Sequence, residues 1–400
     1  MYKIFKNLLE QLVKFYRHIL YSKMGIKLSK DNKHNNVTNQ KVSIADLSIV
    51  KVPADYTMIK ISSFYVNLQN TISIESKAKE IIYYIFTKYK NKVIDIANIE
   101  GFNDNQSLNI FIKMLHLYVL KNNIKIYVAP LFKEFSGSES NTSHVGIVSS
   151  DIAFDTTFNL STERTGGEEK NKKIIRNIII SRYPIDDYVF EELDKETDMD
   201  DIIGIQTILG VCITVHERHL FVFTTTLSHD VQGIDNKKVR ESELKEVVDI
   251  IKGYIHKMKK RDKKYRKAVC ILCGMFNIDE LYGNTMYCEY VQMIQNHNFL
   301  DIYRYISPDN DFGYTTRTKE RLNYIFLYFP SKLCRTNTSK LNLETSLENV
   351  CDNIPTNVTE LLNIIFKTYK IHFIDFYVVK PFEDSIYYPI ELVFMMKNKY

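Results

Sequence analysis

Cysteine and histidine pairs are the first residues of this sequence whose spacing could do chemistry. Cys270 and Cys273 are separated by two residues and Cys288 follows them, an arrangement that invites a zinc site. The pair lies in the apolar run AVCILCGMF, and no histidine or cysteine completes a second half-site at the usual spacing. We therefore expect these cysteines in the core, where cysteine acts as a small hydrophobe.

His216 and His219 form a second candidate pair. They are three residues apart rather than four and lie between two strand signals, so we expect a hairpin turn instead of the metal-binding helix of a metalloprotease. The basic run HKMKKRDKKYRK, residues 256–267, could contact phosphates or anionic lipid, and it equally suits the solvated end of a helix.

The surrounding pattern alternates short β-rich runs with amphipathic helices, which is typical of a layered α/β domain. Apolar residues at three- and four-residue spacing predict helices over 78–86, 108–118, 244–255 and 361–369. Strands are predicted over 58–66, 92–99, 174–181, 209–215, 220–225, 268–276, 322–328, 371–379 and 389–395. Polar stretches over 134–143, 162–172, 191–201 and 335–348 indicate loops. These strands suffice for two stacked sheets.

Composition limits the classes to which this protein could belong. Its 400 residues are 45% hydrophobic and 25% charged, which excludes a disordered or collagen-like polypeptide. A net charge of +5 is too small to indicate a nucleic-acid binder, and six cysteines are too few for a disulfide scaffold, which favours an intracellular, reducing compartment. The longest weakly polar run, residues 202–215, is shorter than the roughly 20 residues of a membrane span.

Three segments are expected along the sequence. Residues 1–23 show helical apolar spacing with lysines and an arginine on the other face, which suits a helix docked on the protein or an interfacial helix on an anionic membrane surface. Residues 24–50 are rich in Lys, Asn and Ser and indicate a flexible linker. Residues 51–400 form the main domain, in which no Gly-rich phosphate loop or dinucleotide signature is found.

A series of segments in the main domain resembles, in order, the motifs of the endonuclease/exonuclease/phosphatase superfamily. They are SSFYVNLQ, KVIDIANIEGFNDN, RNIIISRYPI, HLFVFTTTLSHD, ILCGMFNID, the segment ending in RLNYIFL, and SIYYPIEL. The phrases IEGFND and CEYVQMI look most like neutral sphingomyelinase-type phosphodiesterases. The resemblance implies a four-layer sandwich of two mostly antiparallel or mixed sheets flanked by helices.

The resemblance also assigns roles to individual positions. It implies a metal-binding Glu100 and phosphate-binding Asn67 and Asn277. Other family positions are substituted: the histidine of "NTHL" is replaced by Thr226 and the aspartate of "GDFN" by Met275. Asn323 replaces the aspartate of "RIDY", and Ile386 and Tyr387 replace the aspartate and histidine of "SDH".

These substitutions remove the general-base machinery that the family chemistry needs. A thioether at 275 is a poor ligand for a hard cation, and tyrosine at 387 is too weak a base near neutral pH. Each lost acid or base costs about 10²- to 10⁴-fold in rate. We expect a catalytically inactive homologue of a magnesium-dependent phosphodiesterase, reused for binding or as a structural protein, with magnesium bound weakly at most.

Two alternatives stay open. An active hydrolase with rearranged residues would need Asp279, His229 or Asp384 to have moved into catalytic positions. Alternatively, Glu100 and the asparagines could serve only as structural polar groups. The ligand expected for a binding role contains phosphate, or is a protein partner that the sequence does not identify, and nucleic acid is less favoured.

Overall fold

The computed structural model describes a two-sheet sandwich built from most of the sequence that follows residue 51. The described residues are 52–66, 73–87, 93–102, 104–130, 146–148, 175–193, 206–230, 236–281, 286–297, 299–306, 313–328, 369–379 and 385–399.

Sheet A has seven strands and is mixed. In spatial order they are β12 (Ile371–Val378), β13 (Ile390–Lys397), β1 (Tyr56–Tyr65), β2 (Ile96–Glu100), β5 (Asn177–Ser181), β3 (Ile126–Ala129) and β4 (Gly146–Val148). Only β1 and β2 pair in parallel, and the other neighbours in this sheet are antiparallel.

Sheet B has six strands and is also mixed. In spatial order they are β10 (Phe299–Asp301), β11 (Asn323–Tyr328), β9 (Val269–Met275), β8 (Arg218–Thr226), β7 (Thr207–Val215) and β6 (Ile185–Glu192). The parallel pair is β8 with β9. A parallel pair needs a long crossover, and helix α5 (Lys237–Arg261) supplies it.

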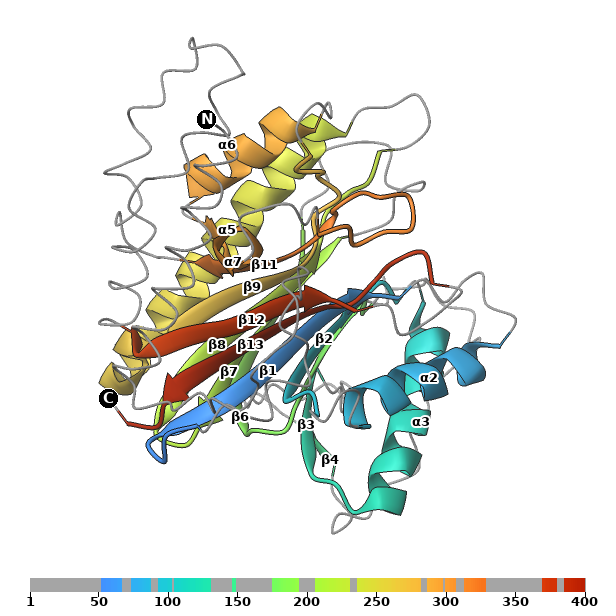
Figure 1. Ribbon diagram of the computed structural model, residues 1–400, viewed down its shortest axis with the longest axis vertical. Coiled ribbons are helices and arrows are strands. Elements are labelled where there is room, and N and C mark those ends of the chain that lie inside the picture. Colours follow the sequence, from blue (N-terminus) through green and yellow to red (C-terminus); the bar gives the residue numbers. More distant parts are fainter. Residues whose placement is uncertain are drawn as a thin grey trace, which may run out of the picture.

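Helices cover the outer faces of both sheets (Figure 1). On sheet A lie α2 (Ile74–Phe86) and α3 (Asn105–Asn122), and on sheet B lie α5 and α6 (Tyr287–His297), with the short helices α7 (Ile302–Ile306) and η3 (Lys263–Lys267) beside them. Ser73 and Asp104 cap the first two helices by accepting hydrogen bonds from backbone N–H groups. The predicted four-layer sandwich of two mixed sheets flanked by helices is confirmed.

Three apolar cores separate the four layers. Ile61 and Ile96 of sheet A meet Ile271 and Ile325 of sheet B in the central core. The second core joins sheet A to α2 and α3, and the third joins sheet B to α5 and α6. Since both faces of each sheet are covered, the central strands read as nearly continuous apolar runs.

All nine predicted strands are present, with ends that shift by a few residues. The strands that sequence reasoning missed are β3, β4, β6 and β10, which are short or carry charged residues. The loop predicted over 191–201 is wrong at its start, because β6 continues through Glu192 in antiparallel pairing with β7. Three predicted helices are confirmed as α2, α3 and α5.

Several predictions fall outside the described residues. They are the N-terminal helix 1–23, the linker 24–50, nearly all of the helix predicted over 361–369, the phosphate ligand Asn67, and the loops 134–143, 162–172 and 335–348. The division of the sequence at residue 51 stays a prediction. Among the described helices, none has the length and apolar character that crossing a membrane requires.

The cysteine and histidine motifs have the structural roles expected of them. Cys270 and Cys273 are buried on opposite faces of β9, one in the outer core and one in the central core. His216 lies in the turn of the β7–β8 hairpin with φ of 55°. Cys270 and Cys273 thus point away from each other, and His216 lies in a hairpin turn as expected.

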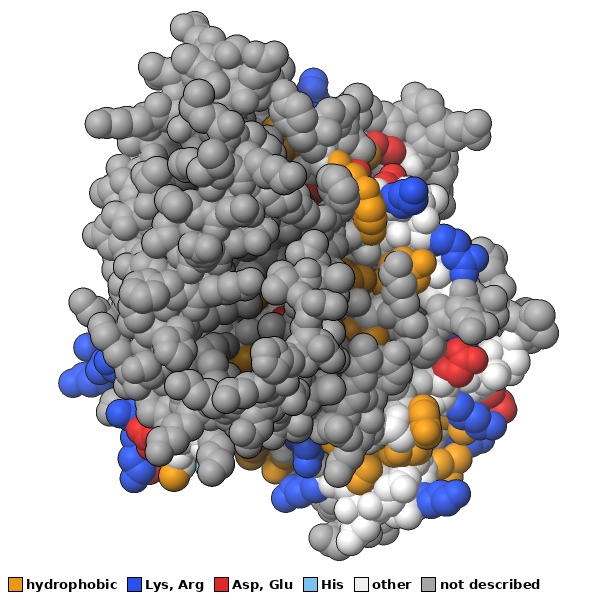
Figure 2. Space-filling view, viewed as in Figure 1, with side chains coloured by type: hydrophobic (Ala, Val, Ile, Leu, Met, Phe, Trp, Pro, Cys, Tyr) orange, Lys and Arg blue, Asp and Glu red, His pale blue; other side chains and the backbone are white. Residues whose placement is uncertain are grey.

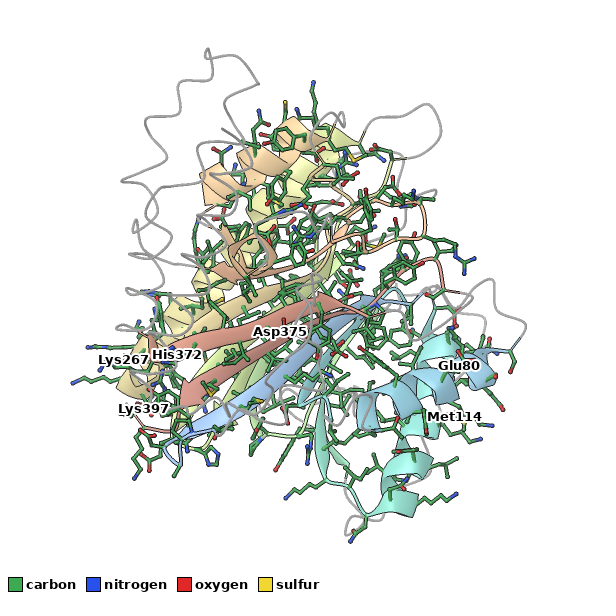
Figure 3. The ribbon with its side chains drawn as sticks, in the orientation of Figure 1. Glu80, Met114, Lys267, His372, Asp375 and Lys397 are labelled. Atoms are coloured by element: carbon green, nitrogen blue, oxygen red, sulfur yellow. The ribbon has the colours of Figure 1, made fainter. Side chains whose placement is uncertain are left out.

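The basic run 256–267 forms the end of α5 and the short helix η3 that follows it. Its Lys and Arg side chains are mostly exposed, while Met258 and Tyr265 are buried beneath them. Lys267 lies at the margin of the molecule in Figure 3. On the face shown in Figure 2, Lys and Arg side chains of the described residues lie in separate groups. Among those residues, that face has no single basic patch of the kind that nucleic-acid binding favours.

Candidate functional site

A buried polar group replaces the apolar core at one end of the sandwich. Along β2, the inward side chains change from Ile96 in the central core to Asn98 and Glu100. Opposite them, Thr224 and Thr226 occupy the inward positions at the end of β8. The alternation of a strand places residues two apart on one face, so these side chains meet between the sheets.

Glu100 is the centre of this group and is completely buried. Its Oε1 accepts hydrogen bonds from Ser63 Oγ of β1 at 3.0 Å and from Thr224 Oγ1 of β8 at 2.5 Å. The second bond joins the two sheets. Burial raises the pKa of Glu100 to about 8, although both hydrogen bonds act in the opposite direction. The carboxyl group is therefore mostly protonated at neutral pH.

Several buried polar atoms near Glu100 have no hydrogen-bond partner among the described residues. They are Glu100 Oε2, Asn98 Oδ1, Asn177 Oδ1, Thr226 Oγ1 and both amide atoms of Asn323. An unsatisfied buried polar atom costs about 1 to 3 kcal/mol. Such a concentration is typical of a site that accommodates water or a polar ligand rather than of a structural network.

Three of the substituted family positions lie side by side in sheet B. Met275 at the end of β9 pairs with Thr226 of β8 on one side and with Asn323 of β11 on the other. Residues opposite each other in a sheet share a face, so all three face the same side as Thr224, which reaches Glu100. The structure therefore brings together Glu100, Thr226, Met275 and Asn323, and none of the last three is a base.

The other two substituted positions lie in the segment 385–389. Tyr387 forms a β-bridge with Thr316, and its ring packs edge-on against Tyr65 with centroids 5.0 Å apart. Tyr65 pairs with Glu100 across β1 and β2. Ile386 is 52% exposed. Tyr65 thus lies beside the Glu100 position, and the ring of Tyr387 packs against it.

Asn277 is buried, but its amide has a local role. It follows β9 in a left-handed conformation with φ of 55°, and its Nδ2 donates to the Leu227 carbonyl at 2.6 Å. This bond joins the segments that leave β8 and β9. Its assignment as a phosphate ligand stays a prediction.

Of the three residues that could restore catalysis, the two that the structure describes, Asp279 and His229, have other surroundings. Asp279 accepts hydrogen bonds from the backbone N–H groups of Arg321 and Leu281, which holds it in a buried ionic network. The side chain of His229 is exposed. Asp384 lies outside the described residues.

That ionic network is well satisfied by hydrogen bonds among the described residues. Arg321, 1% exposed, donates to both oxygens of Asp301 and to Glu280, with distances of 2.6 to 2.8 Å. Its guanidinium also lies over the rings of Tyr303 and Tyr324. The network fixes the segment before β11 and so positions Asn323.

Sequence reasoning missed three residues of the site: Tyr65, Arg176 and Asn177. Asn177 pairs with Glu100 across β2 and β5, and its Nδ2 donates to Thr207 of sheet B. Arg176 is half-buried, its Nε has no hydrogen-bond partner within the described part of the protein, and its charge acts on Tyr65. Burial raises the pKa of Tyr65 to about 12. In the sequence, the signal that could have indicated this part of the site is the polar pair Arg176 and Asn177, directly before the apolar residues 178–180.

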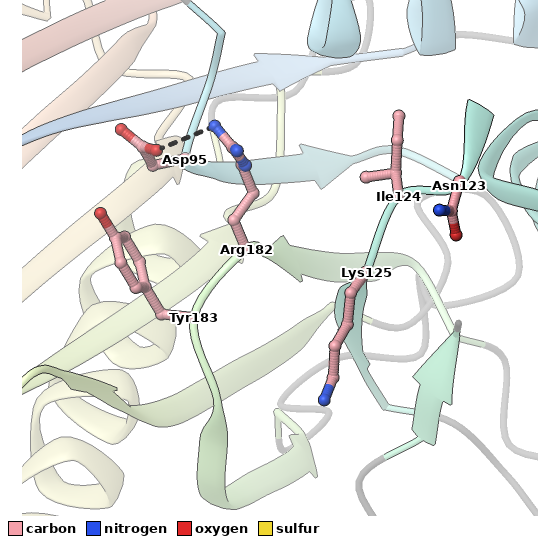
Figure 4. Close-up of a pocket in the computed structure, with 6 residues that line it drawn as sticks. All are labelled: Asp95, Asn123, Ile124, Lys125, Arg182 and Tyr183. Atoms are coloured by element: carbon pink, nitrogen blue, oxygen red, sulfur yellow. Dashed lines mark ion pairs between the residues drawn. The ribbon is translucent and has the colours of Figure 1, made fainter. Parts of the chain in front are cut away.

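A separate pocket of about 410 Å³ lies at the opposite end of β2 (Figure 4). It is lined by Asp95, Asn123, Ile124, Lys125, Arg182 and Tyr183. Arg182 and Asp95 form an ion pair at 3.6 Å, and Arg182 is 46% exposed. Because Asp95 precedes β2 and Glu100 ends it, this pocket is distinct from the polar group described above.

Comparison with known proteins finds likeness only among solved structures. No family model and no curated protein matches the sequence. An endonuclease/exonuclease/phosphatase family protein from Bacteroides thetaiotaomicron matches with 12% identity and a TM-score of 0.44, over 85% of this protein and 96% of that one. This is what the protein is similar to, and the description of its fold rests on its own strand order and layers.

Two further solved structures match to a similar extent. Beta toxin from Staphylococcus aureus has 16% identity and a TM-score of 0.44, over 84% of this protein and 99% of that one. The human nocturnin catalytic domain, solved with a sulfate anion, has 12% identity and a TM-score of 0.46, over 85% and 96%. At these identities the likeness concerns the fold alone, and the roles assigned below rest on this protein's own residues.

Proposed function

We propose that this protein is a catalytically inactive, phosphodiesterase-like protein, most similar to the sphingomyelinase type, that binds a phosphate-bearing ligand without cleaving it. One observation carries the proposal: Glu100 is fully buried, and its described neighbours offer hydroxyl, amide and thioether groups but no acid or base. Phosphodiester hydrolysis needs a group that activates water, and the residues in register with Met275 cannot do so.

The residues around Glu100 do not fit a resident magnesium ion. Mg²⁺ requires near-octahedral oxygen ligands and dehydrates reluctantly, so its sites normally include one or two ionised carboxylates. Here the one carboxyl group among the described residues of the site has a pKa raised to about 8, and its Oε1 already accepts two hydrogen bonds. The remaining oxygens, from Thr226, Asn323 and Asn177, are neutral. We therefore assign no catalytic step to a metal.

A binding role is favoured over a purely structural one by the unsatisfied atoms. In a protein that kept this fold only as a scaffold, we would expect apolar residues of similar shape at these positions, since buried polar atoms without partners reduce stability. Asn323 instead keeps both amide atoms without a partner among the described residues, at 0% exposure. Arg176, half-buried and with its Nε likewise unpartnered there, supplies a positive charge beside Tyr65.

Hydrolysis is tested with a panel of sphingomyelin, a phosphoinositide, single-stranded DNA and a chromogenic diester, each with Mg²⁺. The natural protein is compared with Glu100→Gln, which keeps the shape of the side chain. We expect no turnover above that of the variant on any substrate. Activity that Glu100→Gln abolishes would overturn the proposal in favour of a hydrolase with rearranged residues.

Binding is tested by the thermal unfolding midpoint in the presence of inorganic phosphate. A ligand that binds only the folded state raises the midpoint as its concentration exceeds the Kd. We expect phosphate to stabilise the natural protein and Arg182→Gln, but not Arg176→Gln. These arginines lie beside opposite ends of β5, so Arg182 is the matched control. Equal stabilisation of all three proteins would place the anion elsewhere.

A further inference from the structure

A second cluster of reactive side chains lies at the other end of sheet B. Asp186 of β6, Cys212 of β7 and His219 of β8 each direct a potential metal ligand toward the others, and all three ligand atoms lie within 4.8 Å of one another. Cys212 and His219 are buried, and the Asp186 side chain is 26% exposed. The Glu100 group meets sheet B at Thr207, which begins β7, and at Thr224 and Thr226 near the end of β8, so the two clusters are separate.

A β-bulge brings Asp186 into this cluster. Ile185 pairs with Ile213, but the next pair is Asp187 with Cys212, so Asp186 is the extra residue in β6. Regular alternation would point only one of two consecutive aspartates toward the outer face. With the bulge, Asp187 reaches Arg261 of α5 while Asp186 reaches Thr214 and the ring of His219. Bulges often re-aim a side chain at a functional site.

Hydrogen bonds account for part of the cluster. Thr214 Oγ1 lies 2.6 Å from Asp186 Oδ2 and 3.0 Å from His219 Nδ1, and the Asp186 and His219 atoms themselves are 3.6 Å apart. These contacts do not explain the thiol of Cys212. Nor do they explain Tyr254 of α5, 4% exposed, whose hydroxyl has no hydrogen-bond partner among the described residues and whose charged form would be repelled by Asp187 and Cys212.

We propose that Asp186, Cys212 and His219 bind a divalent transition-metal ion of the zinc class, with the fourth position open to water. A carboxylate, a thiolate and an imidazole together form a donor set that zinc accepts and that magnesium and calcium do not. The 3.6 Å separation of the oxygen and nitrogen atoms is close to that of neighbouring ligands in a tetrahedral site with bonds of about 2.0 to 2.2 Å.

An ion at this position would connect neighbouring strands. The three ligands come from three neighbouring strands, so the ion would cross-link β6, β7 and β8 at the edge of sheet B. The edge-on ring of Tyr265, 4.7 Å from that of His219, helps to hold the imidazole in place. Lys264 of η3 lies above Tyr265 and is 47% exposed, so its charge is largely screened by solvent. Binding would displace the thiol proton of Cys212.

Cobalt(II) titration of the metal-free, full-length protein tests the site. We expect one equivalent to bind, with the near-ultraviolet charge-transfer band of a thiolate ligand and the visible bands of a four-coordinate ion. Cys212→Ser should lose the charge-transfer band, and Asp186→Asn should weaken binding by at least the roughly 10- to 100-fold typical of lost outer partners. Zinc should compete for the site and raise the unfolding midpoint.

Two control variants keep the result interpretable. Cys270→Ser removes another buried cysteine on the same outer face of sheet B, and Cys288→Ser removes the exposed cysteine of α6. Both should retain the band, and circular dichroism should show that every variant is folded. Absence of a thiolate band in the natural protein, or its survival in folded Cys212→Ser, would overturn the assignment.

Discussion

Two buried polar clusters at the same end of the sandwich have opposite hydrogen-bonding states. In the Arg321 cluster, the guanidinium is shared by Glu280 and Asp301, and Asp301 also accepts from Tyr290. In the Glu100 cluster, a few residues away along β9 and β11, several polar atoms have no described partner. The first cluster has the form of a structural network. The unsatisfied atoms of the second are typical of a site that holds water or a polar ligand.

The comparison shows that two positions of one motif, two residues apart, differ in their hydrogen bonding. The arginine of the "RIDY" position is Arg321, and it stabilises the segment that leads into β11. Where that motif has an aspartate, two residues later, stands Asn323, whose amide is unsatisfied by any described residue. Position 321 is thus fully paired, while position 323 is not. The following variants test this difference, from the largest expected effect to the smallest.

Arg321→Met should have the largest effect. It leaves Glu280 and Asp301 as buried carboxylates without their principal partner, and breaking a buried pair in this way costs about 3 to 5 kcal/mol. Urea unfolding should show this loss, or the variant should fail to fold. Lys252→Ala is the control, because its pair with Asp249 is more than half exposed and should contribute less than about 1 kcal/mol. Equal effects would remove the distinction between a buried network and a surface pair.

Glu100→Gln should stabilise the protein in a pH-dependent manner. The folded-state pKa of Glu100 is raised from 4.5 to about 8, so unfolding releases its proton between these values, and the stability of the natural protein falls as pH rises. The variant has no carboxyl group at position 100, so its stability does not fall in this way as the pH rises. Its advantage should be absent near pH 4 and grow to a few kcal/mol at pH 8, since each pKa unit is worth about 1.4 kcal/mol. A pH-independent difference in the urea midpoint would contradict a protonated Glu100.

Asn323→Leu should sharpen the contrast with Arg321. Both residues are buried and polar, but of the two only Asn323 lacks side-chain partners among the described residues. Replacing it by an apolar residue of similar size should raise the free energy of unfolding by about 1 to 3 kcal/mol. Phosphate binding should weaken in the same variant if the amide faces the ligand. Clear destabilisation would show that ordered water or a ligand already satisfies the amide.

Thr224→Val and Thr226→Val form the smallest and best-matched test. The two residues share one face of β8, but Thr224 donates to Glu100 whereas the hydroxyl of Thr226 has no partner among the described residues. We expect Thr224→Val to cost about 1 kcal/mol and Thr226→Val to be neutral or slightly stabilising. Thermal unfolding of both variants at pH 7 measures the difference. A reversed order would mean that the hydroxyl of Thr226 is the one in use.

Much of the fold can be predicted from local patterns. Period-two alternation and β-branched content locate β1, β8 and β9, while apolar spacing locates α2, α3 and α5. The missed strand β6 carries IDDYVFEE, in which a bulge breaks the alternation, so no periodic signal is available. The order of motifs singled out Glu100, Thr226, Met275 and Asn323, and the register of β8, β9 and β11 places the last three side by side.

The sequence by itself determined the layered fold and which chemical groups stand at the end of the sandwich. Residue type fixes the absence of an acid or base at 226, 275 and 323 whatever the packing. Only the tertiary structure decided how those groups behave. Burial and hydrogen bonding depend on strands far apart in the sequence, and they alone make Glu100 a protonated acid, satisfy Arg321, leave Asn323 without described partners and bring Asp186 to Cys212.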